Sequence, residues 1–349
     1  MKLDSSGNGT GNGASSHGAN GSAFFRRREE KYELLAAVAT FLRGEIERHL
    51  PSFEFRKGFL HTYITTIYFD TNRLDLYQQA RAFFDDNLKI RVKEYYYDQA
   101  TTPGMAARFP ADSPERWLTV GYCFVEIKQR IQGLVVKRRF ELPKNLLGRL
   151  LCGDDVWHAL VDSRKGIEFN ETFDIYGEFR RYLQQYKVFP KSVINYRRSV
   201  FQEDEHELRV TFDDEIAVYQ PPAGLYDRTE SLTPATMGKP TRSIPSVIME
   251  IKSRDRYPAW LQSLLETHSP QRLSKFTTSL NILTQELPQP DSPSVGGGGA
   301  LGDDSGTRTR IPDSEILRAE NRLRPTERPL QRKAKGDESD TTEVAEINP

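Results

Sequence analysis

The stretch VIMEIKSRD, residues 247–255, places an acid and a base inside an apolar run. Its apolar residues predict a buried strand, whereas Glu250 and Lys252 stand two residues apart within it. Side chains alternate between the two faces of a strand, so Glu250 and Lys252 share one face. Two interpretations are open: a Glu–Lys pair that holds neighbouring strands together, or a charged face that binds a ligand.

Charge at a spacing of two residues recurs in six further strand-like segments. They are 24–34 (Arg27, Glu29, Lys31), 88–97 (Lys89, Arg91, Lys93), 123–130 (Glu126, Lys128, Arg130), 133–142 (Lys137, Arg139, Glu141), 193–201 (Tyr196, Arg198) and 206–215 (Glu207, Arg209, Thr211, Asp213). One such strand usually belongs to an antiparallel sheet with one face in solvent. Seven mostly basic rows in one chain indicate instead a shared charged face.

Amphipathic helices are predicted at 33–48, 73–82, 170–186 and 258–287, and their apolar stripes need a partner. A large sheet with a polar face also exposes its edges unless it closes. We therefore predict an α+β fold: a closed antiparallel β-barrel with helices packed on the outside and the charged faces lining a tunnel. Lysine and arginine along a tunnel predict a polyanion as the ligand.

The composition gives no global field that would attract such a ligand. Of 349 residues, 49 are lysine or arginine and 49 are aspartate or glutamate, so an anion must be captured by local charge. Two cysteines without a CxxC spacing favour a reducing, cytoplasmic location. No run approaches the ~18 apolar residues of a membrane span. The sequence thus predicts no transmembrane segment in this chain.

Residues 1–23 are rich in glycine, serine and asparagine, and residues 288–349 have mixed charge with few aromatic residues, so both tails are predicted to be disordered. One folded domain is predicted between them, at 24–287. The six histidines lack a zinc-site spacing, and no GxxxxGK[ST] motif is present. In the KRR run at 137–139, alternation separates Arg138 from its neighbours, so no continuous nucleic-acid stripe forms and no nucleic-acid partner is expected.

Nine short motifs occur in an order that resembles the polyphosphate polymerase (VTC, vacuolar transporter chaperone) domain, a branch of the CYTH-like triphosphate tunnel metalloenzymes. They are EKYEL (30–34), TTIYFDTNRLDLY (65–77), IRVKEY (90–95), FVEIKQR (124–130), VVKRRFEL (135–142), NYRRSVF (195–201), LRVTFDDEI (208–216), IMEIK (248–252) and LSKF (273–276). Each motif alone is weakly specific, whereas the ordered set is strongly so. The resemblance implies a barrel that binds triphosphate in a basic tunnel with a divalent metal.

Carried over by position, the resemblance implies a set of phosphate-binding bases: Lys31, Arg91, Lys93, Lys128, Lys137, Arg198, Arg209 and Lys275. Lys89, Tyr196, Ser274 and Lys252 would be further substrate contacts, and Glu250 would hold Mn²⁺ or Mg²⁺. Position 93 is lysine where the family usually has arginine, which replaces a bidentate donor with a point charge. Asp98 stands where a glycine turn is common.

The resemblance implies an enzyme that transfers the γ-phosphate of ATP to a growing inorganic polyphosphate chain. A tunnel triphosphatase and a non-catalytic polyphosphate-binding module remain as alternatives. Tunnel hydrolases begin with ExExK, whereas this chain has Arg27 at the first acid position, which favours retention of a polyanion over activation of water. Yeast-type complexes also carry a phosphate-sensing domain and membrane helices. Neither is recognised here, so product translocation would need a membrane partner that the sequence does not identify.

Overall fold

The computed structural model describes residues 28–286 except 103–104, 111–112, 164–168, 204–206, 228–229 and 255. The predictions for Arg27 and for residues 1–23 and 288–349 lie outside the described residues. The strands are β1 (Arg28–Leu34), β2 (His61–Asp70), β3 (Asn87–Asp98), β4 (Trp117–Thr119), β5 (Tyr122–Ile131), β6 (Leu134–Pro143), β7 (Phe189–Glu203), β8 (Leu208–Tyr219), β9 (Arg242–Ile244) and β10 (Val247–Ser253). The helices are α1 (Ala36–Glu47), α2 (Asp75–Ala82), α3 (Lys144–Leu151), α4 (Trp157–Asp162), α5 (Phe169–Gln184), α6 (Pro234–Met237), α7 (Ala259–Leu265) and α8 (Lys275–Glu286).

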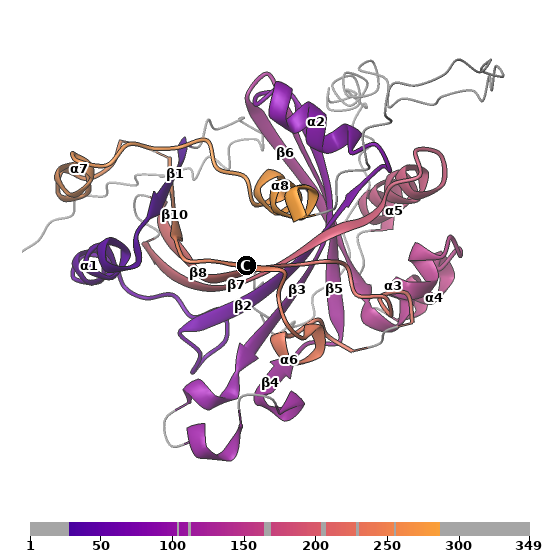
Figure 1. Cartoon of the computed structure of the whole chain (residues 1–349), viewed down its shortest axis with the longest axis horizontal. Helices are drawn as coiled ribbons and strands as arrows, with labels where there is room; N and C mark the ends of the chain where they lie inside the picture. Colours follow the sequence, from indigo (N-terminus) through magenta and orange to yellow (C-terminus); the bar gives the residue numbers. More distant parts are fainter. Residues whose placement is uncertain are drawn as a thin grey trace, which may run out of the picture.

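All ten strands form one antiparallel sheet in the order β1-β10-β8-β7-β2-β3-β5-β6, with β4 added beside β3 and β9 beside β8. The expected α+β class with an antiparallel sheet is therefore confirmed. Closure is not seen in the strand pairing, because no backbone pairing joins β1 to β6 within the described part of the chain. The sheet nevertheless bends strongly, so that its two wings rise on either side of a concave face (Figure 1).

The strand register places the charged rows on the concave face, as alternation predicted. On one wing, Lys31 lies opposite Glu250, and Lys252 lies opposite Arg209. On the other wing, Lys89 lies opposite Lys128, which in turn lies opposite Lys137. Residues directly opposite one another in an antiparallel pair point to the same side of the sheet. Arg198 on β7 likewise lies opposite Asp213 on β8, so the described residues of the seven charged rows share one surface.

Helices cover the convex side of both wings. The apolar stripe of α1 and that of α7 pack on β1, β8 and β10, around buried Leu42, Met249 and Leu261. Helix α5 packs on β5 and β6, where Arg138 points away from the concave face and pairs with Glu178 at 2.6 Å. The prediction of external helices is confirmed for these elements (Figure 1).

Helix α8 corrects the prediction that all helices pack outside. The expected helix at 258–287 is two helices, α7 and α8, and α8 packs on the concave side against β7, β8 and α2. The ring of Phe276 lies 5.2 Å from that of Tyr68, and the Ser279 and Ser192 hydroxyls are 2.8 Å apart. Tyr68 and Ser192 replace charge on this part of the concave face, so an amphipathic helix can bury its apolar side there. Helix α8 thus fills part of the concavity (Figure 1).

Strand β2 was not predicted as a strand, because it carries no charged row. Almost all of its residues are buried, since it lies at the centre of the sheet between β3 and β7 with α8 on one side. Its sequence, HTYITTIYFD, is rich in β-branched and aromatic residues, which fit a strand that is covered on both faces. The period-two search for charge could not find such a strand.

The close approach of α3 to the turn at Tyr226 gives a stability prediction. A Cβ on Gly148 would lie 1.8 Å from the Tyr226 carbonyl oxygen, whereas a Cβ on Gly177 in α5 would meet no atom within 4 Å. Gly148→Ala should lower the free energy of unfolding by about 1–3 kcal/mol. Gly177→Ala, the matched control, should raise it by up to ~1 kcal/mol because alanine favours the helix. Urea unfolding measures both, and equal effects would contradict this packing.

Candidate anion-binding face

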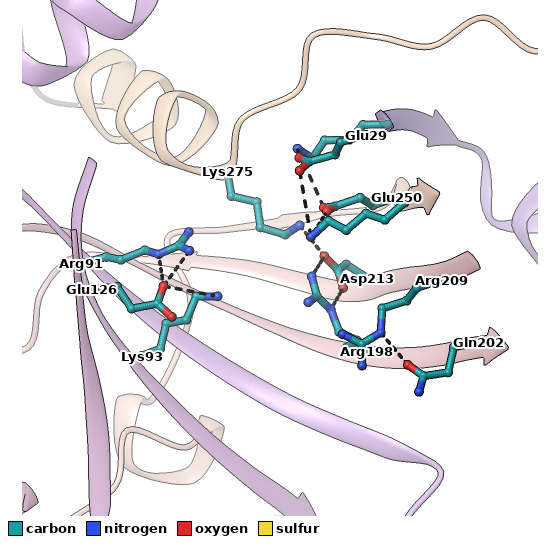
Figure 2. Close-up of polar contacts among 12 residues, drawn as sticks. Glu29, Arg91, Lys93, Glu126, Arg198, Gln202, Arg209, Asp213, Glu250 and Lys275 are labelled. Carbon is teal, nitrogen blue, oxygen red and sulfur yellow. Dashed lines mark hydrogen bonds and ion pairs between the residues drawn. The ribbon is translucent and has the colours of Figure 1, made fainter. Parts of the chain in front are cut away.

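Two groups of basic residues on the concave face are held by buried acids (Figure 2). In the first, the Nε and Nη2 atoms of Arg91 contact Oε2 of Glu126 at 2.7 and 2.6 Å, and the Lys93 ammonium lies 3.9 Å from the same oxygen. The side chain of Glu126 is only 1% exposed. Although burial alone would raise the pKa of Glu126, Arg91, Lys93 and Lys137 hold it far below its ordinary value. The arginine head is therefore fixed by an ionised carboxylate.

In the second group, Asp213 on β8 accepts two hydrogen bonds from Arg198, at 2.6 and 2.8 Å. The Lys275 ammonium at the start of α8 reaches the same carboxylate at 2.5 Å. Asp213 is fully buried, and despite that burial Arg198 and Lys275 lower its pKa. The Tyr196 ring lies beneath both cations, 5.4 Å from the Arg198 guanidinium carbon and 4.7 Å from Lys275 Nζ. Asp213 thus joins β7, β8 and α8 at one point.

The strand pair β1–β10 carries the charges that raised the first question in the sequence. Glu250 contacts Lys252 at 2.8 Å and Lys31 at 3.8 Å. Glu29 forms a hydrogen-bonded ion pair with Lys31 and lies 4.0 Å from Lys252. Both carboxylates have lowered pKa values, because these lysines outweigh the effect of burial. The structure pairs Glu250 and Lys252, as the first interpretation required, and it also exposes them to the concavity.

Three lysines lie in one row across β3, β5 and β6, and they have no acid partner of this kind. Lys89, Lys128 and Lys137 are direct cross-strand neighbours, and none forms a hydrogen bond or ion pair within the described residues, although the charge of Glu126 acts on Lys137. Burial, with the charges of Lys128 and Arg91, lowers the pKa of Lys89 from 10.5 to about 7. Burial also lowers the pKa of Lys128 to about 8, against the attraction of Glu29. Like charges directly opposite one another destabilise a sheet, so the repulsion among these three lysines lowers the stability of the folded protein.

Two further predicted substrate contacts, Arg209 and Ser274, have different surroundings. Arg209 is half-buried, donates to Oε1 of Gln202 at 2.8 Å and lies 5.6 and 5.4 Å from the rings of Phe53 and Phe55. The Ser274 hydroxyl accepts a 3.4 Å hydrogen bond from the backbone of Thr277, so it caps the first turn of α8. Its structural role is therefore evident, and a contact to substrate remains a proposal.

Sequence reasoning assigned no role to the acids Glu29, Glu126 and Asp213. All three were present in the period-two rows, directly beside the predicted bases. The missing information was cross-strand register, which places Glu126 opposite Arg91 and Asp213 opposite Arg198. Register depends on how strands pair, so one strand read alone could not supply it.

The residues at β1–β10 fit a hard divalent cation only in part. Mg²⁺ prefers oxygen ligands and usually takes one or two carboxylates together with water and substrate phosphates. Glu29 and Glu250 supply such carboxylates on adjoining strands, and the described residues contain no group of three or more acids, histidines or cysteines suited to a metal. A cation here would need further oxygens from a phosphate ligand and water. The described residues therefore supply only part of a metal site.

The comparisons with known proteins decide the family. Residues 26–284 match the VTC domain. The chain belongs to the VTC domain family. No curated protein matches the sequence. None of the helices in the described part of this VTC domain combines the length and hydropathy needed to cross a membrane.

Solved structures give distant similarities to the VTC domain. A putative adenylyl cyclase from Hippeastrum, described as having a dominant triphosphatase activity, is 15% identical with a TM-score of 0.33 over 72% of this chain and 94% of that chain. A Pyrococcus horikoshii OT3 protein is 13% identical with a TM-score of 0.35, over 74% and 98%. A putative adenylate cyclase from Bacillus halodurans is 13% identical with a TM-score of 0.34, over 72% and 97%. Similarity at this level says nothing of activity.

The buried pair gives the first prediction for the site. Glu126→Gln leaves the Arg91 guanidinium without its anionic partner, and breaking a buried ion pair in this way should lower the free energy of unfolding by about 3–5 kcal/mol. The matched control is Glu45→Gln on α1, whose pair with Arg48 is largely exposed, and it should change stability by less than ~1 kcal/mol. Urea unfolding compares the two. A Glu126→Gln protein as stable as the control would show that Glu126 does not hold Arg91.

The lysine row predicts how stability depends on pH. Lys89 and Lys128 have pKa values of about 7 and about 8 in the folded protein, below the ordinary 10.5. The unfolded chain therefore binds more protons between about pH 7 and 10.5, so the stability of the anion-free protein should rise with pH in that window. The double variant Lys89→Met/Lys128→Met should show a smaller rise between about pH 7 and 9 in urea unfolding. Equal slopes would contradict the assigned pKa values.

Proposed function

We propose that this VTC domain is a polyphosphate polymerase, which transfers the γ-phosphate of ATP to a growing inorganic polyphosphate chain on its concave face with Mn²⁺ or Mg²⁺. One observation carries the proposal: the unpaired row of Lys89, Lys128 and Lys137 lies beside arginines that buried acids already hold in place. A bound polyanion would neutralise the row and relieve its repulsion.

The arrangement suits phosphoryl transfer, which needs positioning of the phosphate groups and stabilisation of their charge more than covalent chemistry by the protein. Arg91 and Arg198 are oriented by their acids before a ligand arrives, and each guanidinium has five N–H donors, of which the acid takes two. Lysines supply mobile point charges along the chain. Fixed arginines would hold the reacting phosphates, whereas the lysine row would hold the polymer.

We propose that the concave face forms a tunnel, although no backbone pairing joins β1 to β6 within the described residues. Charges from the two ends of the sheet affect one another: Lys128 on β5 lowers the pKa of Glu29 on β1, and Lys252 on β10 lowers that of Lys137 on β6. Such coupling requires the wings to face each other at short range. Side chains, together with α8, would then enclose the ligand where backbone pairing does not.

In this proposal Lys31, Lys93 and Lys275 also bind phosphate, and Arg209, Lys252, Tyr196 and Ser274 are further contacts. Glu250, with Glu29 beside it, would hold the metal. When bound, a divalent cation would neutralise charge on the phosphate oxygens. The protein's own contribution is to orient those oxygens and to exclude water from the concavity.

A triphosphatase in the same fold is the second candidate, and the carboxylates of Glu29 and Glu250 on adjoining strands favour it, since acids that hold metals can activate water. Both carboxylates are held by lysines, however, and the described residues contain no larger acid cluster. Two carboxylates that are already paired with lysines favour retention of phosphate over metal-assisted hydrolysis. A non-catalytic binding module would use the same lysine row without turnover.

The direct test is incubation of the purified protein with ATP and Mn²⁺, with gel detection of polyphosphate and parallel assays of ADP and orthophosphate. Polymer with ADP is the expected result. Orthophosphate without polymer would establish the triphosphatase, and tripolyphosphate binding with neither product would establish the binding module.

A variant in the lysine row distinguishes a role in anion binding from a role in the stability of the fold. Lys128→Met removes a repelled cation that has no acid partner, so the melting temperature without ligand should be unchanged or higher. Its stabilisation by tripolyphosphate should be smaller than that of the wild type, which would gain about 2.7 kcal/mol at a hundredfold excess over Kd. Lys57→Met, at an exposed position before β2, is the control and should keep the full shift. A full shift in Lys128→Met would remove the lysine row from the binding site.

A further inference from the structure

Four charged side chains on β1 and β10 form a closed ring of alternating sign. Glu29 contacts Lys31, Lys31 lies 3.8 Å from Glu250, Glu250 lies 2.8 Å from Lys252, and Lys252 lies 4.0 Å from Glu29. The side chains are between 12% and 36% exposed, so none is fully solvated. The ring is net neutral, and each acid is shared by two bases.

The ring is not needed to hold its two strands together. Strands β1 and β10 are already in register over Arg28–Leu34, and the apolar cluster beneath α1 and α7 packs their other face. The ring instead faces the concavity, where Lys128 acts on Glu29 and Arg198 acts on Glu250. Its surroundings are therefore those of the proposed ligand.

A divalent cation arriving alone would meet unfavourable competition. It could bind Glu29 and Glu250 only by displacing Lys31 and Lys252, whose ammonium groups would be left unpaired in a region that already contains Lys128 and Arg198. A phosphate chain arriving alone would draw the lysines away and leave two partly buried carboxylates unpaired. Leaving a partly buried charge unpaired is unfavourable in both cases.

When both ligands arrive, every charge of the opened ring gains a partner. The cation takes the carboxylates, the phosphate oxygens take the ammonium groups, and the cation and phosphate contact each other. We propose that Lys31 and Lys252 block a metal site formed by Glu29 and Glu250 until polyphosphate binds the two lysines and frees the carboxylates. We call this competition within the ring the interlock. Metal and polyphosphate then bind with positive coupling. This inference rests on the proposed function for the identity of the anion.

The interlock is tested most cleanly without any phosphate, because metal and phosphate also associate in solution. Mn²⁺ binding to the purified protein in an anion-poor buffer is followed by the loss of the electron paramagnetic resonance signal of free Mn²⁺. Wild type should bind Mn²⁺ weakly. Lys252→Met removes the base closest to Glu250 and should bind Mn²⁺ roughly 5- to 150-fold more tightly, the usual range of a coupling between sites.

Lys57→Met is the control, because it removes one positive charge at an exposed position before β2, outside the ring and the lysine row. It should bind Mn²⁺ as weakly as the wild type does. Tight Mn²⁺ binding by wild type, no gain in Lys252→Met, or an equal gain in Lys57→Met would each overturn the interlock. A melting curve verifies that each variant is folded, and Lys252→Gln replaces Lys252→Met if the latter does not fold.

The same proteins separate this inference from the proposed function. Stabilisation of the wild type by tripolyphosphate without metal reports on the anion site alone. If tripolyphosphate does not stabilise the protein but Lys252→Met gains Mn²⁺ affinity, the proposed function fails and the competition between lysine and metal stands. If tripolyphosphate stabilises it and Lys252→Met gains nothing, the interlock fails alone.

Discussion

Glu126 and Asp213 are carboxylates with almost no exposure to solvent, and the organisation of the concave face depends on them. An isolated buried carboxylate would be protonated or would destabilise the fold, so each must have cationic partners. Those partners are Arg91, Lys93, Arg198 and Lys275, drawn from β3, β7 and α8. The acids thus select which cations are fixed. In the proposed function the lysine row that lacks such acids holds the polymer, and the arginines that the acids fix hold the reacting phosphates.

Helix α8 follows from the same constraint. Lys275 at its start completes the charge balance of Asp213, while Phe276 and Leu280 behind it join the main apolar core. One helix can therefore lie inside a largely charged concavity, because its first residue is polar and the rest meets Tyr68 and Ser192. It also covers part of the space that a closed barrel would leave open. The shape of the site is set by side chains as much as by strand pairing.

The sequence predicted the shared charged face well, because alternation on a strand is a local property. Lys89, Arg91 and Lys93 were correctly assigned to one side of β3, and Arg138 was correctly assigned to the opposite side of β6 from Lys137. Pairing across strands was not predictable in the same way. The ion pairs of Glu126 and Asp213, and the open path between β1 and β6, depend on register and curvature that no single segment encodes. Strand β2 carries no charged row and was missed for the opposite reason, since a strand buried on both faces has no alternating signal.

The central claim is that unpaired lysines on the concave face are the ligand-binding groups. Brief acetylation at about pH 8, with and without tripolyphosphate, followed by mass spectrometry, tests it directly, because only uncharged amines react. Lys89 and Lys128 have lowered pKa values and should react readily without ligand and become protected when tripolyphosphate is present. Exposed Lys57 should react equally in both conditions. Unchanged labelling of Lys89 and Lys128 with saturating tripolyphosphate would contradict the claim.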